Sequence, residues 1–387
     1  MSHPLTIHHR LDEIDPDEWD ALGEADYPFT RHAFLNGLEL HDCLLPWGWQ
    51  PAHFALRDNG RLVAALPAYI KDNSYGELVF DHAWASAYQR SGLDYYPKLV
   101  SAVPYTPATG PRLLLRRDIH DKEQRRTLKR QLVDSAIAFC RAQGLSGWHL
   151  LFEREERLED LEDSRLLQRQ DCQFHWRNPG YGDFEDFLAA LRSAKRKNIR
   201  RERRHVAQSG LRIRRQPGHE LTDDEWRRVH QLYAGIFDRK YGAPTLSADF
   251  FRHLGRELGD QVLVVTVRPD DDERIIACSL FLQDSQRLYG RIWGCDEHHE
   301  FLHFECCYYQ GIEHCIERGL RHFDPGAQGE HKAPRGFLPT RTVSTHWLAN
   351  EDFRRLIRRH LQAEREQVDD YCAYWQAHSP YRREASR

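Results

Sequence analysis

The sequence contains one methionine, no C-x-x-C cysteine pair and no apolar run that approaches 18 residues. Without such a run we expect no membrane-spanning helix, and the N-terminus MSHPLTIHHRLDEI lacks the apolar core of a signal peptide. The nine cysteines are scattered except for the adjacent Cys306 and Cys307, so their spacing predicts no structural zinc site. We therefore expect a cytoplasmic protein with reduced thiols and no bound metal.

Several functional fingerprints are missing as well. The sequence has no Walker loop, no Rossmann glycine pattern and no nucleophile elbow, so we expect no tightly bound cofactor. The net charge is −4, which does not predict a polyanion-binding protein from overall charge. A chain of 387 residues with 40% hydrophobic residues is long enough for two domains, each with its own core.

Two passages of the chain share one strand pattern. HFALR, RLVAALPAYI and GELVF lie within residues 53–80, and QVLVVTV, RIIACSLFLQ and RLYGRIW lie within residues 261–293. Each passage predicts a three-stranded antiparallel meander, and Asn59-Gly60 is typical of a hairpin turn. A helical pattern and a further strand follow each passage, and we expect the first helix, from about Lys122 to Gln143, to end at Gly144 and the second to end at Gly319. The repeat predicts two α/β domains with mixed central sheets and flanking helices, at residues 1–172 and 173–387.

Two further helices are predicted at residues 184–208 and 351–376, the second with Asn350 as its N-cap. We expect the C-terminal helix to pack on the outer face of its domain. The helix at 184–208 carries a basic face over about half of its cylinder. The candidate anion-binding residues on this helix are Lys195, Arg196, Arg200, Arg201 and Arg204. This face is either a solvated surface or a site for an anionic partner, which is tRNA, a nucleotide-linked substrate or a coenzyme phosphate.

The segment from Asp324 to Phe337 combines glycines with titratable groups. Three glycines allow the backbone to approach a ligand closely, and Glu330, His331 and Lys332 are adjacent. The segment is a phosphate cradle, a substrate-binding loop or a glycine-rich turn.

A second polar segment runs from Ser74 to Tyr88 and places Asp81 and His82 after a predicted strand. This pair is either a base with its orienting carboxylate or a buried pair that braces the domains. We predict that this segment and the segment from Asp324 meet at one cleft, because unpaired polar groups are costly to bury.

The sequence resembles a bacterial family of predicted N-acyltransferases that are Fem-like, with two tandem GNAT-like (acyl-CoA N-acyltransferase) domains. The motifs that carry the resemblance are SYGELVFDHAWASAY, YYPKL, VPYTPATGPRLL, QFHWRN, KRKNIRRER, YGRIWGC, FLHFECCYYQGIEHCIERGL and GAQGEHKAPRGFLP. They span about residues 27–370.

The resemblance implies transfer of an acyl or aminoacyl group to an amine acceptor, such as a cell-wall precursor. Acyl-CoA and aminoacyl-tRNA are both candidate donors. The stretch GCDEHHEFLH lacks the Q/R-x-x-G-x-G/A loop with which ordinary GNAT enzymes bind pyrophosphate, and Fem-type enzymes depart from that loop too. The alternative is a non-catalytic GNAT-like protein that recognises a cell-wall precursor or RNA.

Acyl transfer to an amine needs a base and a group that stabilises the oxyanion. The candidate catalytic residues are His82, oriented by Asp81, and Glu330 or His331. The candidate substrate-binding residues are Trp84, Tyr289, Trp293, Gln328, Lys332 and Arg335. In this hypothesis the aromatic residues line the acceptor pocket, and the two cations hold the donor or the oxyanion.

Overall fold

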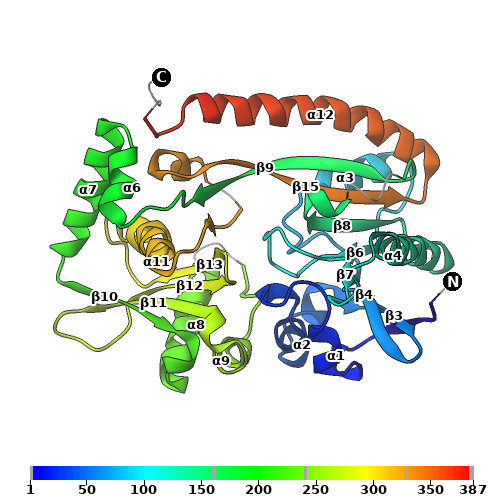
Figure 1. Ribbon diagram of the computed structural model, residues 1–387, viewed down its shortest axis with the longest axis horizontal. Helices are drawn as coiled ribbons and strands as arrows, with labels where there is room; N and C mark the ends of the chain where they lie inside the picture. Colours follow the sequence, from blue (N-terminus) through cyan, green and yellow to red (C-terminus); the bar gives the residue numbers. More distant parts are fainter. Residues whose placement is uncertain (1–2, 159–162, 239–241, 328, 383–387) are drawn as a thin grey trace. The chain divides into compact units, whose positions relative to one another are not determined.

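A computed structural model describes residues 3–158, 163–238, 242–327 and 329–382 (Figure 1). The chain divides into two compact units, the first from residues 1–171 and 341–369, the second from residues 172–340 and 370–387. Three elements have residues in both units: β9 (Leu167–Arg177), β15 (Leu338–Leu348) and α12 (Glu351–Ala377). No helix within the described ranges offers an apolar stretch that could reach across a lipid bilayer.

The first unit is built from short strands and a few helices. Its further strands are β1 (Leu5–His8), β2 (Trp49–Pro51), β3 (His53–Asp58), β4 (Arg61–Leu66), β5 (Tyr69–Lys71), β6 (Lys98–Ser101), β7 (Leu114–Leu115) and β8 (Gly147–Glu153), and its helices are α1 (Pro16–Asp20), α2 (His32–Leu40), α3 (His82–Arg90), α4 (Lys122–Ala142) and α5 (Glu155–Leu158). β1, β3, β4 and β7 form one antiparallel sheet. β15, β8, β6, β5 and β2 lie side by side, with β6 and β8 parallel.

Helix α4 covers the core of the first unit. Its buried face, which includes Leu132 and Ile137, packs with Phe54 of β3 and Trp148 of β8. The helix ends before Gly144, whose φ of +66° is a left-handed conformation that glycine adopts without strain. The helix predicted before residue 144 is confirmed.

The third strand predicted for the first meander is wrong. Residues 76–80 form turns and bends rather than a strand, and β5 leaves the β3–β4 hairpin to pair with β6. Gly76 and Leu78 have φ values of +79° and +61°, which no strand contains. The side chain of Glu77 is buried against Lys98, so the chain turns here to bring that carboxylate inward.

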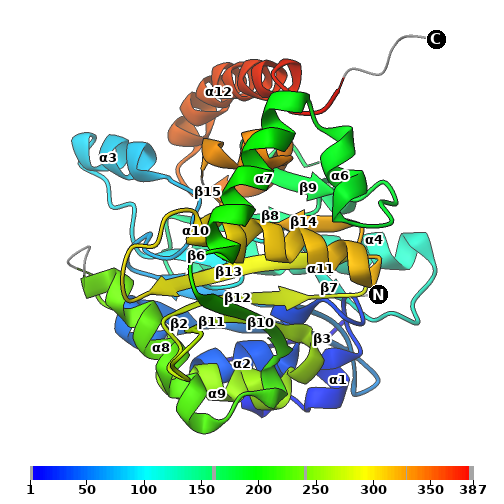
Figure 2. The same cartoon turned by 90° about the vertical axis from the view of Figure 1, so that its left-hand side faces the viewer.

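The second unit contains the meander that the sequence predicts. Its further strands are β10 (Leu211–Pro217), β11 (Val262–Pro269), β12 (Ala277–Gln283), β13 (Arg287–Cys295) and β14 (His322–Asp324), and its helices are α6 (Phe184–Ala190), α7 (Ser193–Ala207), α8 (Asp223–Asp238), α9 (Ala248–Glu257), α10 (Leu302–Phe304) and α11 (Gln310–Arg318). The strand order is β10-β11-β12-β13-β14-β9, and only β13 and β14 are parallel. Figures 1 and 2 show α11 on one face of this sheet and α8 and α9 on the other.

The helix predicted at 184–208 is interrupted. It forms α6 and α7, and between them Arg192 is extended, with φ −58° and ψ 145°. The amide N–H of Arg192 donates to the carbonyl oxygen of Pro380 at 2.9 Å, and Leu191 forms a β-bridge with Tyr381. The C-terminal segment therefore supplies backbone hydrogen bonds that replace helical ones at the break.

The two units differ from the predicted domains 1–172 and 173–387 at the C-terminus. Residues 341–369 belong to the first unit, although we placed them in the second domain. The physical reason is that β15 pairs with β8, while Phe353 and Ile357 of α12 pack with Tyr88. The Asn350 N-cap is confirmed, because its Oδ1 accepts from the amides of Asp352 and Phe353, both at 3.0 Å.

Candidate functional site

The loop after β14 begins where two parallel strands part. β13 and β14 pair from Arg287 opposite His322 to Tyr289 opposite Asp324, and β13 then continues to Cys295 while β14 ends. Gly326 has φ +96°, and a Cβ atom there would lie 3.5 Å from the carbonyl oxygen of Gly290. The loop therefore stays close to the backbone of β13, where its polar groups gather.

Lys332 is a buried cation beneath this loop. Its side chain is on a 3-10 helix (Glu330–Arg335), the residue is 2% exposed, and its Nζ donates to the carbonyl oxygen of Gly326 at 2.5 Å. Asp324 is also buried, and its Oδ1 accepts from the amide of Gly326 at 2.9 Å. Burial lowers the pKa of Lys332 to about 8, although the charge of Asp324 opposes this shift. Such a lysine releases its proton at a lower pH than an ordinary one.

His175 of β9 completes this buried group. Its Nε2 lies 3.6 Å from Oδ1 of Asp324, and burial lowers its pKa while the charge of Asp324 raises it. Lysine, carboxylate and imidazole thus lie together under the start of the loop. Buried groups with shifted pKa values are typical of functional sites, but structural networks shift them too.

His331 lies at the outer side of the same loop. Its Nε2 is 2.7 Å from Oη of Tyr308, and its ring is 6.1 Å from that of His303. His331 is exposed as a residue, but Tyr308 and Phe304 partly cover its ring, and this partial desolvation lowers the pKa of His331. The charges of Lys332 and Arg335 add to this effect. Burial lowers the pKa of His303 to about 4. Both imidazoles are therefore neutral at neutral pH, and a neutral imidazole can accept a proton.

The guanidinium group of Arg335 is fixed by hydrogen bonds within the second unit. Its Nη2 donates to Oε1 of Glu202 at 2.8 Å, its Nε to Oη of Tyr309 at 3.0 Å, and its Nη1 to the carbonyl oxygen of His331 at 2.7 Å. The guanidinium lies 3.4 Å from the ring centroid of Phe304. Arg335 thus ties the loop to α7, and this geometry favours bracing over the predicted contact with substrate.

Glu330 does not lie in the buried group. It is exposed, and its Oε1 accepts from the phenol of Tyr371 at 2.8 Å. That Glu330 is the base stays a prediction, because exposure does not distinguish it from His331, which is exposed too. Gln328 lies outside the described residues.

The two aromatic residues of β13 that we predicted for the acceptor pocket have different surroundings. Trp293 is partly exposed, and its ring packs edge-on against His303 with centroids 5.4 Å apart. Tyr289 is buried, and its phenol donates to Oδ2 of Asp284 at 2.8 Å. Trp293 therefore lies beside the histidines, whereas Tyr289 packs in the core rather than in a pocket.

The predicted pairing of His82 with Asp81 is wrong. Asp81 is buried and accepts from Nζ of Lys98 at 2.5 Å and from the phenol of Tyr95 at 2.6 Å, whereas His82 is exposed at the start of α3. Trp84 is also buried, with its ring 4.9 Å from that of His346, so it packs in the core rather than in an acceptor pocket.

Lys98, which holds this segment in place, is not among the residues predicted for the site. Lys98 is fully buried, and its Nζ also donates to Oε2 of Glu77 at 2.8 Å. Burial raises the pKa of Glu77 to about 7, with Lys98 opposing the shift. Burial would also raise the pKa of Asp81, but the charge of Lys98 outweighs it and the pKa is lowered. A lysine within the short apolar strand YYPKLV was the available signal.

The loop at Ser74–Tyr88 belongs to the first unit and the segment Asp324–Phe337 to the second. That they meet at one cleft stays a prediction.

The basic face of α7 is partly used within the second unit. Arg200, Arg201 and Arg204 are exposed, while Lys195 and Arg196 are partly buried. Arg203, which lies on the same helix, donates to both Glu305 and Glu313. Arg200 forms an ion pair with Glu185. The anion-binding role of this face stays a prediction.

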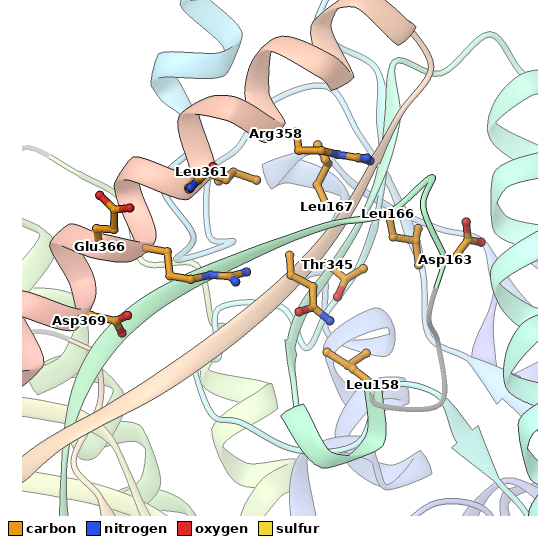
Figure 3. A pocket seen from close by; sticks show the side chains of 12 residues that line it. Leu158, Asp163, Leu166, Leu167, Thr345, Arg358, Leu361, Glu366 and Asp369 are labelled. Carbon is orange, nitrogen blue, oxygen red and sulfur yellow. The ribbon is translucent and has the colours of Figure 1, made fainter.

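A separate hollow lies within the first unit (Figure 3). It encloses about 700 Å³, and Arg358 and Leu361 of α12 line it together with Leu167 of β9 and Thr345 of β15. None of the predicted site residues lines it, so it gives no support to the predicted acceptor pocket.

Solved structures resemble the chain at low sequence identity. FemX matches with a TM-score of 0.53 and 10% identity, over 92% of this chain and 100% of that one. The C-terminal domain of a putative lysylphosphatidylglycerol synthetase from Agrobacterium fabrum matches with 0.53 and 12%, over 86% and 90%. L-PGS from Bacillus licheniformis matches with 0.52 and 10%, over 89% and 96%. This likeness shows the fold, which is the predicted tandem GNAT-like α/β fold.

No curated protein matches the chain. The FemAB_like family model, described as peptidoglycan biosynthesis/recognition, matches residues 10–383. Because this match covers nearly the whole chain, the protein belongs to the FemAB_like family.

Proposed function

We propose that this protein is a transferase that moves an acyl or aminoacyl group to an amine, and that the reacting centre lies in the second unit around His331. The observation that carries the proposal is the hydrogen bond between a neutral His331 and Tyr308, beside the buried Lys332. The family description supports a cell-wall precursor as the acceptor. FemX and the lysylphosphatidylglycerol synthetase share the fold, which is consistent with group transfer.

The reaction needs a neutral amine to attack the carbonyl carbon of an ester or thioester. A bond forms from the amine nitrogen to this carbon, and the carbonyl oxygen takes the negative charge. The carbonyl then re-forms as the ester or thioester bond breaks, and the alcohol or thiol leaves with the proton that the amine gave up. His331 accepts the proton that the attacking amine loses, because its lowered pKa keeps the imidazole neutral. The positive charge of Lys332 stabilises the oxyanion electrostatically, from beneath the loop.

The donor is either acyl-CoA or aminoacyl-tRNA. The stretch after β13 turns into α10 through Phe301, with φ +63°, and the sequence there has no glycine-rich phosphate loop. The exposed arginines of α7 support a polyanionic donor such as aminoacyl-tRNA.

A direct test supplies labelled aminoacyl-tRNA and labelled acyl-CoA separately to the purified protein, with cell-wall precursors that carry a free amine. Covalent label on the amine, found by mass spectrometry, is the expected result with one donor. A complete lack of transfer from both donors, by protein that binds the precursor, would favour the alternative function.

That alternative is a non-catalytic protein that recognises a cell-wall precursor or RNA. One specific observation favours it: the cations of the loop are already bonded inside the protein, Lys332 to Gly326 and Arg335 to Glu202. Satisfied cations hold a loop in shape without any substrate.

A further inference from the structure

A second cavity lies in the first unit, at the C-terminal end of α2. It encloses about 460 Å³ and is lined by Glu39, Leu40, Asp42 and Leu45, together with Arg10 and Asp12. None of these residues belongs to the proposed transfer site.

The rim of this cavity is unusually apolar for a surface. Among the large apolar side chains of the described residues, Leu45 and Leu40 are the most exposed, at 68% and 59%. Two such leucines at one concave site present apolar area that a ligand can cover.

The wall of the cavity carries an ionised carboxylate. The side chain of Glu39 is 10% exposed, and its Oε1 accepts from Nε2 of His53 at 2.7 Å. The other ring nitrogen of His53, Nδ1, accepts from the amide N–H of Ala68 at 3.3 Å, so this imidazole carries one proton and is neutral. Oε2 of Glu39 accepts from the amide of Leu11 at 2.8 Å. The carboxylate charge is therefore not cancelled, and both oxygens can accept a further hydrogen bond.

The other charges around the cavity are also negative on balance. Asp42 is exposed and forms no ion pair within the described residues. Arg10 donates from its Nε to Oδ1 of Asp12 at 3.0 Å, and its charge also interacts with Glu39, so one cation stands against the three carboxylates Asp12, Glu39 and Asp42. Helix α2 ends at Leu40, which lines the cavity, so the negative end of the helix dipole also lies there. The net negative charge of the lining and this dipole favour a cation.

We propose that this cavity binds an aliphatic ammonium group. The ammonium donates hydrogen bonds to Glu39 and Asp42, and its hydrocarbon stem covers Leu40 and Leu45. The inference does not depend on the proposed transfer reaction, because it rests on the first unit alone.

The test is an NMR titration of the full-length protein with n-pentylammonium at low ionic strength, compared with 1-pentanol and pentanoate. We expect saturable shifts with n-pentylammonium and binding at least about tenfold weaker for the other two compounds, which lack the charge-assisted hydrogen bonds. Asp42→Asn should weaken binding about tenfold, and Leu45→Gln should weaken it several-fold. The control, Asp58→Asn at the exposed end of β3, removes the same charge elsewhere in the unit and should leave binding unchanged.

These variants are at exposed positions, so the fold should survive them. The proposal is overturned if n-pentylammonium does not bind, or if 1-pentanol or pentanoate binds as tightly as n-pentylammonium. It is also overturned if the Asp42→Asn and Leu45→Gln variants both bind n-pentylammonium with the affinity of the parent protein.

Discussion

The imidazole of His331 and the phenol of Tyr308 are joined by a hydrogen bond of 2.7 Å between Nε2 and Oη. Burial raises the pKa of Tyr308, so its hydroxyl keeps its proton at neutral pH. Partial desolvation of its ring lowers the pKa of His331, so the ring stays neutral at neutral pH. The pair therefore combines a fixed hydroxyl with an imidazole that is ready to accept a proton.

Replacing Tyr308 by Phe should lower the transfer rate about tenfold, because one hydrogen bond that orients the base is lost. Steady-state kinetics with the donor found to be active is the measurement. Tyr374→Phe removes a phenol from an exposed position on α12 and is the matched control. An unchanged rate for Tyr308→Phe would mean that the hydroxyl does not orient His331.

Replacing Lys98 by Met should destabilise the protein by about 3–5 kcal/mol, because Glu77 and Asp81 would remain buried without their cation. Urea denaturation followed by circular dichroism measures the free energy of unfolding. The triple variant Lys98→Met, Glu77→Gln, Asp81→Asn should recover much of the loss. If the single variant is as stable as the parent, Lys98 does not hold the loop.

Replacing Lys332 by Met should change how stability depends on pH. The pKa of Lys332 is about 8 in the folded protein and 10.5 ordinarily, so between these values the unfolded chain binds more protons. The stability contribution of Lys332 therefore increases as pH rises from about 8 to about 10.5. Relative to the variant, the parent protein should gain on the order of 3 kcal/mol over this window. Parallel stability curves for the two proteins would contradict a lowered pKa.

Replacing Arg200, Arg201 and Arg204 by Gln should weaken tRNA binding. The negative slope of log affinity against log salt concentration should become less steep by about 2. Filter binding across a salt series measures both quantities. The control variant changes the exposed arginines Arg214, Arg227 and Arg256 to Gln, which removes the same charge. Equal losses in the two triple variants would leave α7 as an ordinary solvated face.

The sequence predicted elements where side-chain periodicity and caps agree. Asn350 begins α12, Gly319 ends α11 with φ +68°, and the meander of β11 to β13 is where the pattern placed it. In these cases local preference and burial point to the same conformation, so the sequence pattern is sufficient.

The sequence was misleading where a distant side chain decides the local conformation. Residues 76–80 are GELVF, a short and mainly apolar run that is typical of a strand, but Glu77 is buried against Lys98 and Leu78 takes a left-handed conformation. Asp81 and His82 are neighbours in the chain, yet one side chain is buried and the other exposed. Their position in the sequence did not show that Asp81 has the buried partners Lys98 and Tyr95.

Within the predicted loop, the sequence showed which titratable residues are present but not what each of them does. The cluster of Glu330, His331 and Lys332 was visible in the sequence, but it could not show that Lys332 is buried and Glu330 exposed. The contributions of Tyr308, Asp324 and His175 depend on strand and helix packing that composition does not record.

The central claim is that His331 is the base of an acyl transfer reaction, and the most direct test compares the pH–rate profiles of His331→Gln and the parent protein. The parent should lose activity as pH falls through a pKa below the ordinary 6.5, because the protonated imidazole cannot accept a proton. His331→Gln should be slower by about 100-fold or more and should lack this acidic limb. His219→Gln, at an exposed histidine of the same unit, should behave like the parent. A His331→Gln variant with the parent's rate and the same acidic limb would contradict the account.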